Sequence, residues 1–522
     1  MKGWIREEVF NLLPFSFFED PFSFVQQSSG EIIKDSRHRW AGIFTLPSHK
    51  KIFLKGDKTK GWLEALKYSF LPSKGRKEWF IAHQLQKKGL SIPKPFGWME
   101  RVHRRWIQES YYLSEAVGSG GSLIDLLKSK ENIPIESLAK AVRRFHDAGV
   151  FHKDLHAGNF LWSGEDFFLT DLHRAKILPS LPLEKRLWNL AQWFHSLRSI
   201  WEEMEFLLFL RKYFGEKSMD PQSEKVMFQR ILSMMLHLQR RQFKSRTKRC
   251  LKESSEFSVN KEDNIFYYHR REFPLDLLKN KIEEHLNISK QKSDVLVKEE
   301  SGVTISILKG NGHGVILKEF RPVSFWSRFK ELFRYSKAMK AWVNGNGLIV
   351  RGMATLKPLG VAEERGSLGL RQSFFLMEAL GEGQELDRYL FNEFQNILGK
   401  RLFVKTFARW VAHLHKMSIY HRDMKACNIL VSKNEGSWNF HLLDLEDVRL
   451  DRKVKEKELF KNFLQLNTSI PRTVTKTDRL RFLKNYFWFN PVMEYNKEWI
   501  LRLIQKSKER GVVYVTPHGV VE

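Results

Sequence analysis

The sequence predicts an α+β fold that occurs twice along a chain of 522 residues. The first observation is a repeat: SYYLSEAVGSG at residues 110–120 recurs as SFFLMEALGEG at residues 373–383, with six of eleven positions identical. The second is that strand-like runs come first and helical runs later in each half. A shift of 263 residues indicates a duplicated domain, because solenoid repeats have periods of only about 20–50 residues.

The composition is that of a large globular protein. Hydrophobic residues make up 42% of the chain and aromatic residues 13%, which excludes a disordered chain. The only cysteines, Cys250 and Cys427, exclude a disulfide framework and a multi-cysteine zinc site. No run of about 18 uncharged apolar residues is present, so we expect no membrane-spanning helix and a cytoplasmic protein.

The chain is strongly basic, with 88 Lys and Arg against 60 Asp and Glu and a formal net charge of +28. Such a charge favours a polyanionic partner: nucleic acid, an anionic membrane surface, nucleotide phosphates or a phosphorylated glycolipid. Charge does not distinguish between these partners. No recognisable zinc, RNA-binding or helix-turn-helix pattern is present, so we expect no nucleic acid partner.

The repeat defines the expected domains. The shift of 263 residues also places Lys55 onto Lys318, and FHDAGVFHKDLHAGNFLW matches LHKMSIYHRDMKACNILV further on at a shift of 269. We therefore predict a first domain over residues 1–216 and a second over residues 291–522. Residues 217–290 are expected to form a basic helical connector and the entry of the second domain, because they contain the acid-free run RRQFKSRTKRCLK.

Each copy shows the same order of elements. A short strand ending in lysine, KIFLK or GVILK, precedes a helix around residues 78–85 or 339–348. Amphipathic helical runs at residues 138–146 and 403–415 then lead into HKD and HRD loops. Two apolar runs separated by turn residues follow each loop, which is the pattern of a β-hairpin.

Four residue types recur in a fixed order: a strand lysine, an Asp in a His-x-Asp loop, an Asn five residues later, and an Asp ending the next strand. In the first copy they are Lys55, Asp154, Asn159 and Asp171, and in the second Lys318, Asp423, Asn428 and Asp444. Phosphoryl transfer from ATP requires such parts: a lysine for the phosphates, a base for the attacking hydroxyl, and Asn and Asp for magnesium, with manganese as the alternative. The pattern predicts two protein-kinase-like domains, each with a small β-rich N-terminal lobe and a larger helical C-terminal lobe.

The two copies differ at two places near these residues. Glu78, on the helix after Lys55, is placed to pair with that lysine and so to assist nucleotide binding, whereas the matching residue of the second copy is Ala341. Conversely, Lys425 lies two residues after Asp423, where it can neutralise the transferring phosphate, and the first copy has His156 there. Glu78 and Lys425 are therefore candidate accessory groups of different copies.

The motifs FHKDLHAGNFLW with LTDLHRAKI, and YHRDMKACNILV with LLDLEDVRL and TDRLRFLKNYF, resemble the Kdo/WaaP lipopolysaccharide kinase family. The resemblance covers about residues 32–487 as a tandem pair. It implies Asp154 and Asp423 as bases and Asp171 and Asp444 as metal ligands. It also implies ATP as phosphate donor, a Kdo (3-deoxy-D-manno-octulosonic acid) or heptose hydroxyl of the lipopolysaccharide inner core as acceptor, and peripheral attachment to the inner face of the cytoplasmic membrane.

Other functions remain alternatives. The catalytic parts do not define the acceptor, so a protein or a small molecule is another candidate substrate. Neither copy has a G-x-G-x-x-G loop before its lysine, and no A-P-E follows the D-L-H or D-L-E ending. Together with Ala341, these departures leave a pseudokinase scaffold, with one or both copies inactive, as the non-enzymatic alternative.

Overall fold

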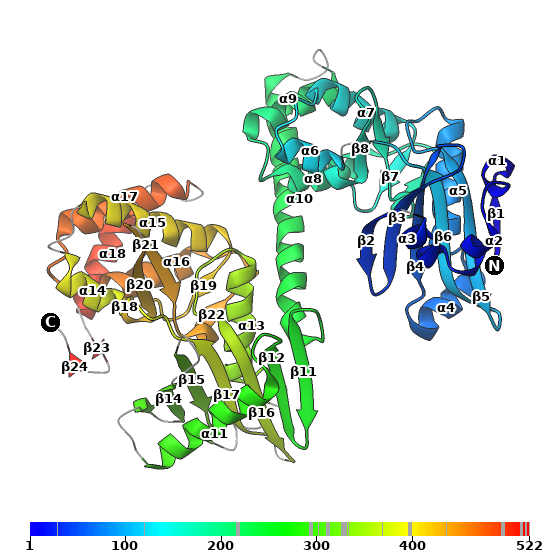
Figure 1. Cartoon of the computed structure of the whole chain (residues 1–522). Helices are drawn as coiled ribbons and strands as arrows, with labels where there is room; N and C mark the ends of the chain where they lie inside the picture. Colours follow the sequence, from blue (N-terminus) through cyan, green and yellow to red (C-terminus); the bar gives the residue numbers. More distant parts are fainter. Residues whose placement is uncertain are drawn as a thin grey trace. The chain divides into compact units, whose positions relative to one another are not determined.

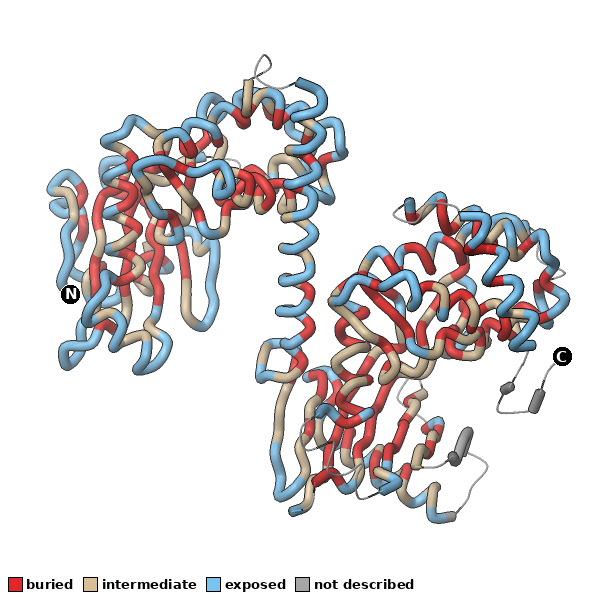
Figure 2. Tube along the Cα trace, turned by 180° about the vertical axis from the view of Figure 1, so that it is seen from behind, coloured by how far each residue is buried: buried red, intermediate tan, exposed pale blue. Residues whose placement is uncertain are grey.

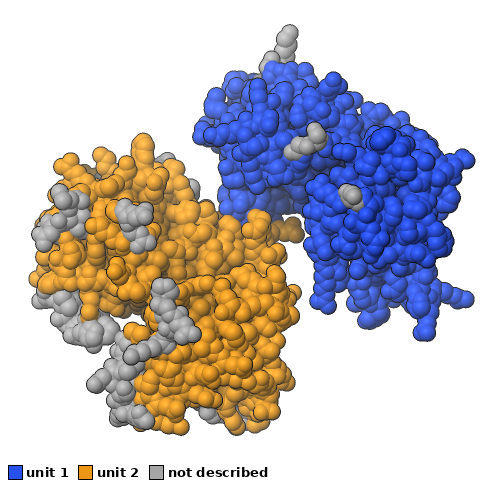
Figure 3. All heavy atoms as spheres, in the orientation of Figure 1, with its two compact units in different colours: residues 1–239 blue, residues 240–522 orange. Residues whose placement is uncertain are grey.

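The computed structural model describes the chain apart from residues 29, 119–120, 216–219, 292–295, 301, 309–313, 325–330, 332–333, 368, 395–398, 435, 492–495, 512–514, 517–518 and 521–522. It divides into two compact units, Met1–Gln239 and Arg240–Glu522 (Figure 3). Each unit begins with an antiparallel sheet and continues into a mainly helical part (Figure 1). This mixture of helices and strands confirms the α+β content expected from the sequence.

The sheet of the first unit has six antiparallel strands in the order β1-β5-β6-β4-β3-β2. They are β1 (Lys2–Ile5), β2 (Glu31–Ser36), β3 (Arg39–Thr45), β4 (Lys51–Lys58), β5 (Pro95–His103) and β6 (Trp106–Glu115). In β4, Ile52 and Leu54 are buried in an apolar core on one face of the sheet. Because side chains alternate along a strand, Lys55 and Asp57 lie on the opposite face.

Helices accompany this sheet. They are α1 (Glu7–Phe10), α2 (Phe15–Glu19), α3 (Pro21–Gln27), α4 (Gly61–Phe70) and α5 (Lys74–Lys87). The start of α5 is set by Ser73, whose hydroxyl accepts a hydrogen bond from the Arg76 amide, an N-cap that satisfies one of the unpaired donors of the first turn. α5 packs on β5 and β6 and carries Glu78.

The helical part of the first unit holds the predicted hairpin and the two short turns that flank it. Its elements are α6 (Leu123–Lys128), α7 (Ile135–Asp147), β7 (Val150–His152), η1 (Ala157–Asn159), β8 (Phe160–Trp162), β9 (Phe167–Leu169), η2 (Leu172–Arg174), β10 (Ala175–Ile177), α8 (Leu183–Leu197), α9 (Glu203–Phe214) and α10 (Pro221–Thr247). β8 pairs with β9, as expected from the turn-separated apolar runs. The core contains large aromatic side chains such as Trp193, Phe194 and Phe209, all fully buried.

The second unit has a seven-stranded sheet in the order β11-β12-β16-β17-β15-β14-β13. Its elements are η3 (Lys248–Leu251), β11 (Phe257–Glu262), β12 (Ile265–Arg270), α11 (Leu275–Gln291), β13 (Leu296–Glu300), β14 (Val303–Leu308), β15 (Val315–Phe320), α13 (Lys337–Val350), β16 (Pro358–Gly366) and β17 (Gly369–Glu378). α13 begins with the cap seen at α5: the Ser336 hydroxyl accepts from the Met339 amide at 3.0 Å. Ser336 is Ser73 shifted by 263 residues, so the repeat includes this cap.

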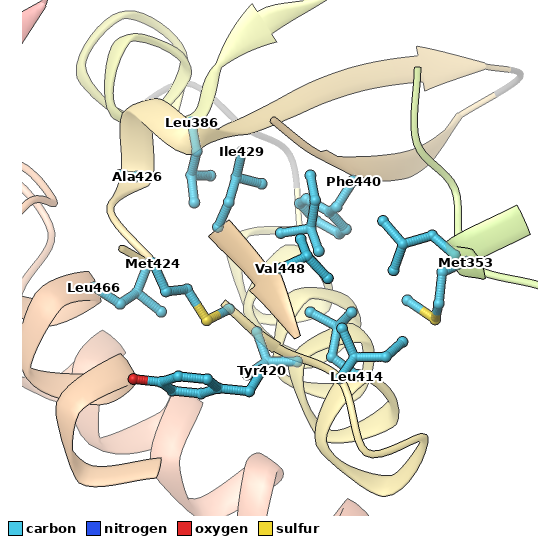
Figure 4. Packing of buried hydrophobic residues seen from close by; sticks show 14 of the residues in the cluster. Met353, Leu386, Leu414, Tyr420, Met424, Ala426, Ile429, Phe440, Val448 and Leu466 are labelled. Carbon is cyan, nitrogen blue, oxygen red and sulfur yellow. The ribbon is translucent and has the colours of Figure 1, made fainter. Parts of the chain in front are cut away.

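The helical part of the second unit follows the same order. Its elements are β18 (Gln384–Glu385), α14 (Leu386–Asn392), α15 (Lys400–Lys416), β19 (Tyr420–His421), η5 (Ala426–Asn428), β20 (Ile429–Asn434), β21 (Ser437–Leu442), η6 (Leu445–Asp447), β22 (Val448–Arg449), α16 (Glu456–Asn467), α17 (Lys476–Phe489), α18 (Lys497–Arg510), β23 (Val515–Thr516) and β24 (Gly519–Val520). Tyr420, Met424 and Val448 belong to one apolar cluster around the HRD loop (Figure 4). Buried residues run along the strands and inner helices of both units (Figure 2).

The segment expected to be a helical connector is not helical throughout. Within the described part of residues 217–290, α10 and α11 are separated by a hairpin of β11 and β12, and β12 also pairs with β16. The physical reason is the sequence FSVNKEDNIFYYHR, in which β-forming residues flank a turn where Asp263 adopts a φ of 47°. The basic run around Cys250 lies at the end of α10 and in η3, with its described Lys and Arg side chains exposed and Phe243, Thr247 and Cys250 buried.

A buried histidine recurs at the same place in both units. His146 Nδ1 in α7 lies 2.6 Å from the hydroxyl oxygen of Tyr213, and His415 Nδ1 in α15 lies 2.8 Å from that of Tyr486. Burial lowers the pKa of His146 to about 3 and that of His415 to about 4. Both imidazoles are therefore neutral at physiological pH.

We expect acidification from pH 7 to pH 5 to destabilise the fold through these two histidines. An unfolded histidine has a pKa of about 6.5, so in this window the unfolded chain takes up protons that the folded chain does not, at a cost of about 2 kcal/mol per histidine by pH 5. Urea unfolding of the wild type and of His415→Gln at both pH values measures this effect. The variant should lose less free energy of unfolding on acidification than the wild type; an equal loss would show that His415 is not neutral when folded.

Candidate active site

In the first unit, the structure brings together the strand lysine, the helix glutamate and Asp171, which lies between β9 and η2. Lys55 Nζ lies 2.9 Å from Glu78 Oε2 and also contacts the carboxylate of Asp171. Lys55 and Glu78 are 7% and 3% exposed, so this is a buried charge cluster. Burial alone would lower the pKa of Lys55, but the charges of Glu78 and Asp171 raise it, so the ammonium form is retained.

The turn after Asp171 completes this cluster. Asp171 has a φ of 56°, in the left-handed region that Asp tolerates better than most residues. The conformation brings His173 back, with its Nδ1 3.0 Å from Asp171 Oδ1 and 3.5 Å from Glu78 Oε2. Burial would lower the pKa of His173, but the hydrogen bonds to Asp171 and Glu78 raise it. The Leu172 amide donates to Glu78 Oε1 at 3.1 Å, which ties the turn to α5.

The His-x-Asp loop of the first unit positions Asp154 beside the cluster. His152 Nε2 lies 3.1 Å from the carbonyl oxygen of Asp171, and Asn159 donates from Nδ2 to the carbonyl of Asp154 at 2.9 Å. The Asp154 side chain is 46% exposed and contacts the guanidinium of Arg174. The buried His152 therefore holds the loop to the end of β9, while the carboxylate of Asp154 is accessible to a substrate.

In the second unit, a different residue supplies the missing carboxylate. Lys318 Nζ lies 2.5 Å from Asp444 Oδ1 and 3.9 Å from Glu446 Oε1, while Ala341 on α13 is fully buried. Burial would lower the pKa of Lys318, but the charges of Glu446 and Asp444 raise it. Asp444 has a left-handed φ of 46°, as Asp171 does. Glu446 occupies the position that His173 has in the first unit, so the second carboxylate has moved from the helix to the turn.

The second loop also holds its aspartate. Lys425 Nζ lies 3.0 Å from Asp423 Oδ2, and Asn428 donates from Nδ2 to the Asp423 carbonyl at 2.7 Å. Gln465 donates from Nε2 to Asp423 Oδ1 at 3.0 Å. Lys425 thus lies next to the candidate base Asp423.

Three polar residues on one helix face position each loop, and the sequence analysis missed them. They are Asn189, Gln192 and Ser196 on α8, and Asn462 and Gln465 on α16 with Ser469 just beyond its end. The Asn side chain donates to the carbonyl of His152 or His421 at 2.6 Å in both units, and the Ser hydroxyl accepts from the amide of Ala157 or Ala426 at 3.0 and 2.8 Å. We call each set of Asn, Gln and Ser the clasp of its loop. The spacing N-x-x-Q-x-x-x-S recurs at a shift of 273 residues, so a search for repeats could have found the clasp in the sequence.

The start of β3 also reaches the cluster. Arg39 donates to Asp57 Oδ1 at 2.8 Å, and its Nη2 lies 3.3 Å from His173 Nε2. A cavity of about 550 Å³ opens here, and its lining includes Arg37, Arg39, His173 and Arg174. Neither unit has a G-x-G-x-x-G motif before its lysine, and in the first unit the turn between β2 and β3 carries the basic residues Arg37 and His38.

The donors present suit a divalent cation. Among the described residues, one ligand atom each of Glu78, Asp171 and His173 lies within 4.8 Å of the other two. Hard cations such as magnesium prefer carboxylate and amide oxygens, which Asp171 and Asn159 carry in the first unit and Asp444 and Asn428 in the second. The chemistry of these side chains fits such an ion.

A family model described as the lipopolysaccharide kinase (Kdo/WaaP) family matches residues 24–213 and 320–486, one region in each unit. The chain belongs to the Kdo/WaaP lipopolysaccharide kinase family. It is therefore a kinase, and the two matched regions include Asp154 and Asp171 in the first unit and Asp423 and Asp444 in the second.

Named relatives are similar to this Kdo/WaaP family member over less than half of its length. The lipopolysaccharide core heptose(I) kinase WaaP of Pseudomonas aeruginosa is 28% identical over 217 residues, which is 37% of this chain and 81% of the relative. The 3-deoxy-D-manno-octulosonic acid kinase of Pasteurella multocida is 25% identical over 32% of this chain and 69% of its own length. A solved structure described as WaaP in complex with acyl carrier protein aligns with 22% identity and a TM-score of 0.32, over 45% of this chain and 99% of its own.

Removing the clasp should loosen the second loop. In Asn462→Ala the carbonyl of His421 loses its buried partner, and an unsatisfied buried polar group costs about 1–3 kcal/mol. We expect a fall of that size in the free energy of unfolding, measured with urea. The control is Asn485→Ala in α17, which removes a hydrogen bond to the carbonyl of Arg481 in that helix. It should lower the free energy of unfolding by less than Asn462→Ala does. An equal cost in the two variants would contradict a special role for the clasp.

Proposed function

We propose that each unit is a protein-kinase-like domain and that the protein transfers the γ-phosphate of ATP to a Kdo or heptose hydroxyl of the lipopolysaccharide inner core. The observation that carries this proposal is the buried lysine-aspartate pair next to a His-x-Asp loop, present in both units. The relatives named as heptose and Kdo kinases support the choice of a sugar acceptor.

The proposed reaction follows from the side chains in place. The acceptor oxygen attacks the γ-phosphorus, the bond to the bridging oxygen of ADP breaks, and the hydroxyl proton passes to Asp154 or Asp423. Lys55 and Lys318 hold the phosphates in a buried site, where a paired ammonium interacts more strongly with charge than it would in water. A divalent cation, magnesium or manganese, held by the Asn and second Asp of each unit would supply further charge neutralisation.

The second unit also carries the groups that nucleotide binding requires. Glu446 gives Lys318 a second carboxylate in place of the helix glutamate, and Lys425 lies beside Asp423 to neutralise the transferring phosphate. These contacts favour nucleotide binding in both units over a wholly inactive second copy.

The acceptor determines where the protein would act. A lipopolysaccharide precursor is an amphiphile in the cytoplasmic membrane, so we propose peripheral attachment to its inner, anionic face, with the basic chain supplying the attraction. Among the described residues, no helix is both long and apolar enough to cross a bilayer.

Transfer of label from γ-labelled ATP to purified inner-core lipopolysaccharide, with a generic protein acceptor in parallel, tests the reaction. Removing a catalytic base typically lowers the rate by about 10²–10⁴-fold, so Asp154→Asn and Asp423→Asn should each abolish transfer by its own unit. Label that appears only in the protein acceptor would refute a sugar acceptor. Transfer that persists in the double variant would show that the bases are wrongly assigned, and ATP binding without any transfer would support a pseudokinase.

The role of Glu446 has its own test. Glu446→Gln removes one of two carboxylates near Lys318. Glu446 Oε1 lies 3.9 Å from Lys318 Nζ, an ion pair without a hydrogen bond, so we expect ATP to bind the second unit only about a few-fold more weakly. Glu78→Gln removes a charge-assisted hydrogen bond, which is worth about 1.5–3 kcal/mol, so it should weaken ATP binding to the first unit about tenfold or more. Isothermal titration with an Asp171→Ala or Asp444→Ala background isolates each site. Glu456→Gln, at the exposed start of α16, is the matched control and should bind as the wild type does. Unchanged affinity in Glu446→Gln would exclude this role.

A further inference from the structure

The helix α4 has its apolar side chains on the outside. Trp62, Leu63, Leu66 and Phe70 are 73%, 65%, 41% and 83% exposed, and no residue of this helix is buried. Their spacing places them along one side of a helix with 3.6 residues per turn. Surface helices of globular domains normally bury such a stripe, so α4 presents an unpartnered apolar face at the end of the sheet where β4 ends (Figure 1).

The inner side of α4 is polar and firmly held. Glu64 accepts from the amide of Lys60 at 2.6 Å and from the hydroxyl of Tyr68 at 3.0 Å, and it lies 3.3 Å from Lys74 Nζ. Thr59, just before the helix, donates to the carbonyl of Ile107 in β6 at 2.7 Å. Hydrogen bonds and ion pairs therefore orient the helix, and the apolar stripe is not needed to hold it.

The charge around this stripe is basic. Residues 58–76 contain five Lys or Arg and one acid, Glu64, and that acid is the one paired inward. Lys58, Lys60, Lys67 and Arg76 are exposed. An apolar stripe flanked by exposed basic side chains is the pattern of a helix that lies in the interface of an anionic membrane.

The same helix borders the candidate active site of the first unit. Lys60 and Glu64 line the cavity of about 550 Å³ that His173 and Arg174 also line. One side of α4 thus faces the cavity next to Asp171, while the other side exposes Trp62 and Phe70. A molecule with a polar end in this cavity could have its apolar end beside the stripe.

We propose that the outer face of α4 docks on an anionic phospholipid bilayer and so holds the cavity of the first unit at the membrane surface. The choice of a bilayer over a protein partner rests in part on the proposed function, because the acceptor would be a glycolipid embedded in that bilayer. Aromatic residues at both ends of the stripe, Trp62 and Phe70, favour the interfacial region of a bilayer. The exposed lysines supply the attraction to anionic headgroups.

Vesicle flotation of the full chain tests the proposal. Vesicles of phosphatidylglycerol and phosphatidylethanolamine should bind the wild type, and phosphatidylcholine vesicles or high salt should weaken binding. The triple variant Trp62→Ser, Leu66→Ser, Phe70→Ser should bind the anionic vesicles at least tenfold more weakly, and Phe70→Ser alone should show part of this loss. The double variant Met204→Ser, Leu208→Ser on α9 removes two exposed apolar side chains elsewhere and should bind as the wild type does.

Two further measurements separate this proposal from the proposed function. Phosphate transfer to a soluble, deacylated acceptor reports the reaction without the membrane, and the α4 variant should retain it. Transfer to the soluble acceptor without vesicle binding would refute the docking face alone. Vesicle binding without transfer would refute only the proposed sugar acceptor. The proposal would be overturned if the triple variant bound vesicles as well as the wild type does. It would also be overturned if the wild type formed dimers in sedimentation and the triple variant did not, since the stripe would then be covered by a second copy.

Discussion

The arrangement of each unit depends on one buried ammonium group. A charged lysine removed from water costs several kcal/mol unless it is paired and hydrogen-bonded, so Lys55 and Lys318 require carboxylates at close range. Those carboxylates come from segments far apart in the sequence, Glu78 and Asp171 for the first lysine and Asp444 and Glu446 for the second. The need for pairing therefore connects the sheet of each unit to its helical part at one point.

A comparison of the two units shows which features the pairing of the buried lysine keeps constant and which it allows to differ. Both units keep the lysine strand, the left-handed aspartate and the clasp of Asn, Gln and Ser. They differ in the origin of the second carboxylate: the first unit uses a helix and adds a histidine in the turn, while the second uses the turn itself. Two carboxylates per lysine are retained although their positions are not.

Much of this could be predicted from the sequence, because repeated spacing is a strong signal. The α+β content, the strand position of Lys55 and Lys318 and the helix position of Glu78 follow from local pattern and duplication. What the sequence did not reveal depends on tertiary contacts. Glu446 approaches Lys318 only because Asp444 adopts a left-handed φ, and the clasp acts across about 40 residues. The β11–β12 hairpin was not predicted because β12 is held in part by β16, about 90 residues further along the chain, and such a contact leaves no local pattern in the sequence.

The helix α10 contributes buried side chains to both units. Phe228 and Ile231, in its first half, are buried in the core of the first unit, whereas Phe243, near its end, packs under the guanidinium of Arg351 in the second. A single continuous helix therefore contributes to the stability of both halves. A chain cut between Gln239 and Arg240, at the boundary between the units, would leave Phe228 and Ile231 with the first unit and Phe243 with the second. It would break the backbone hydrogen bonds of α10 that cross the cut, so each half would end in a frayed helix.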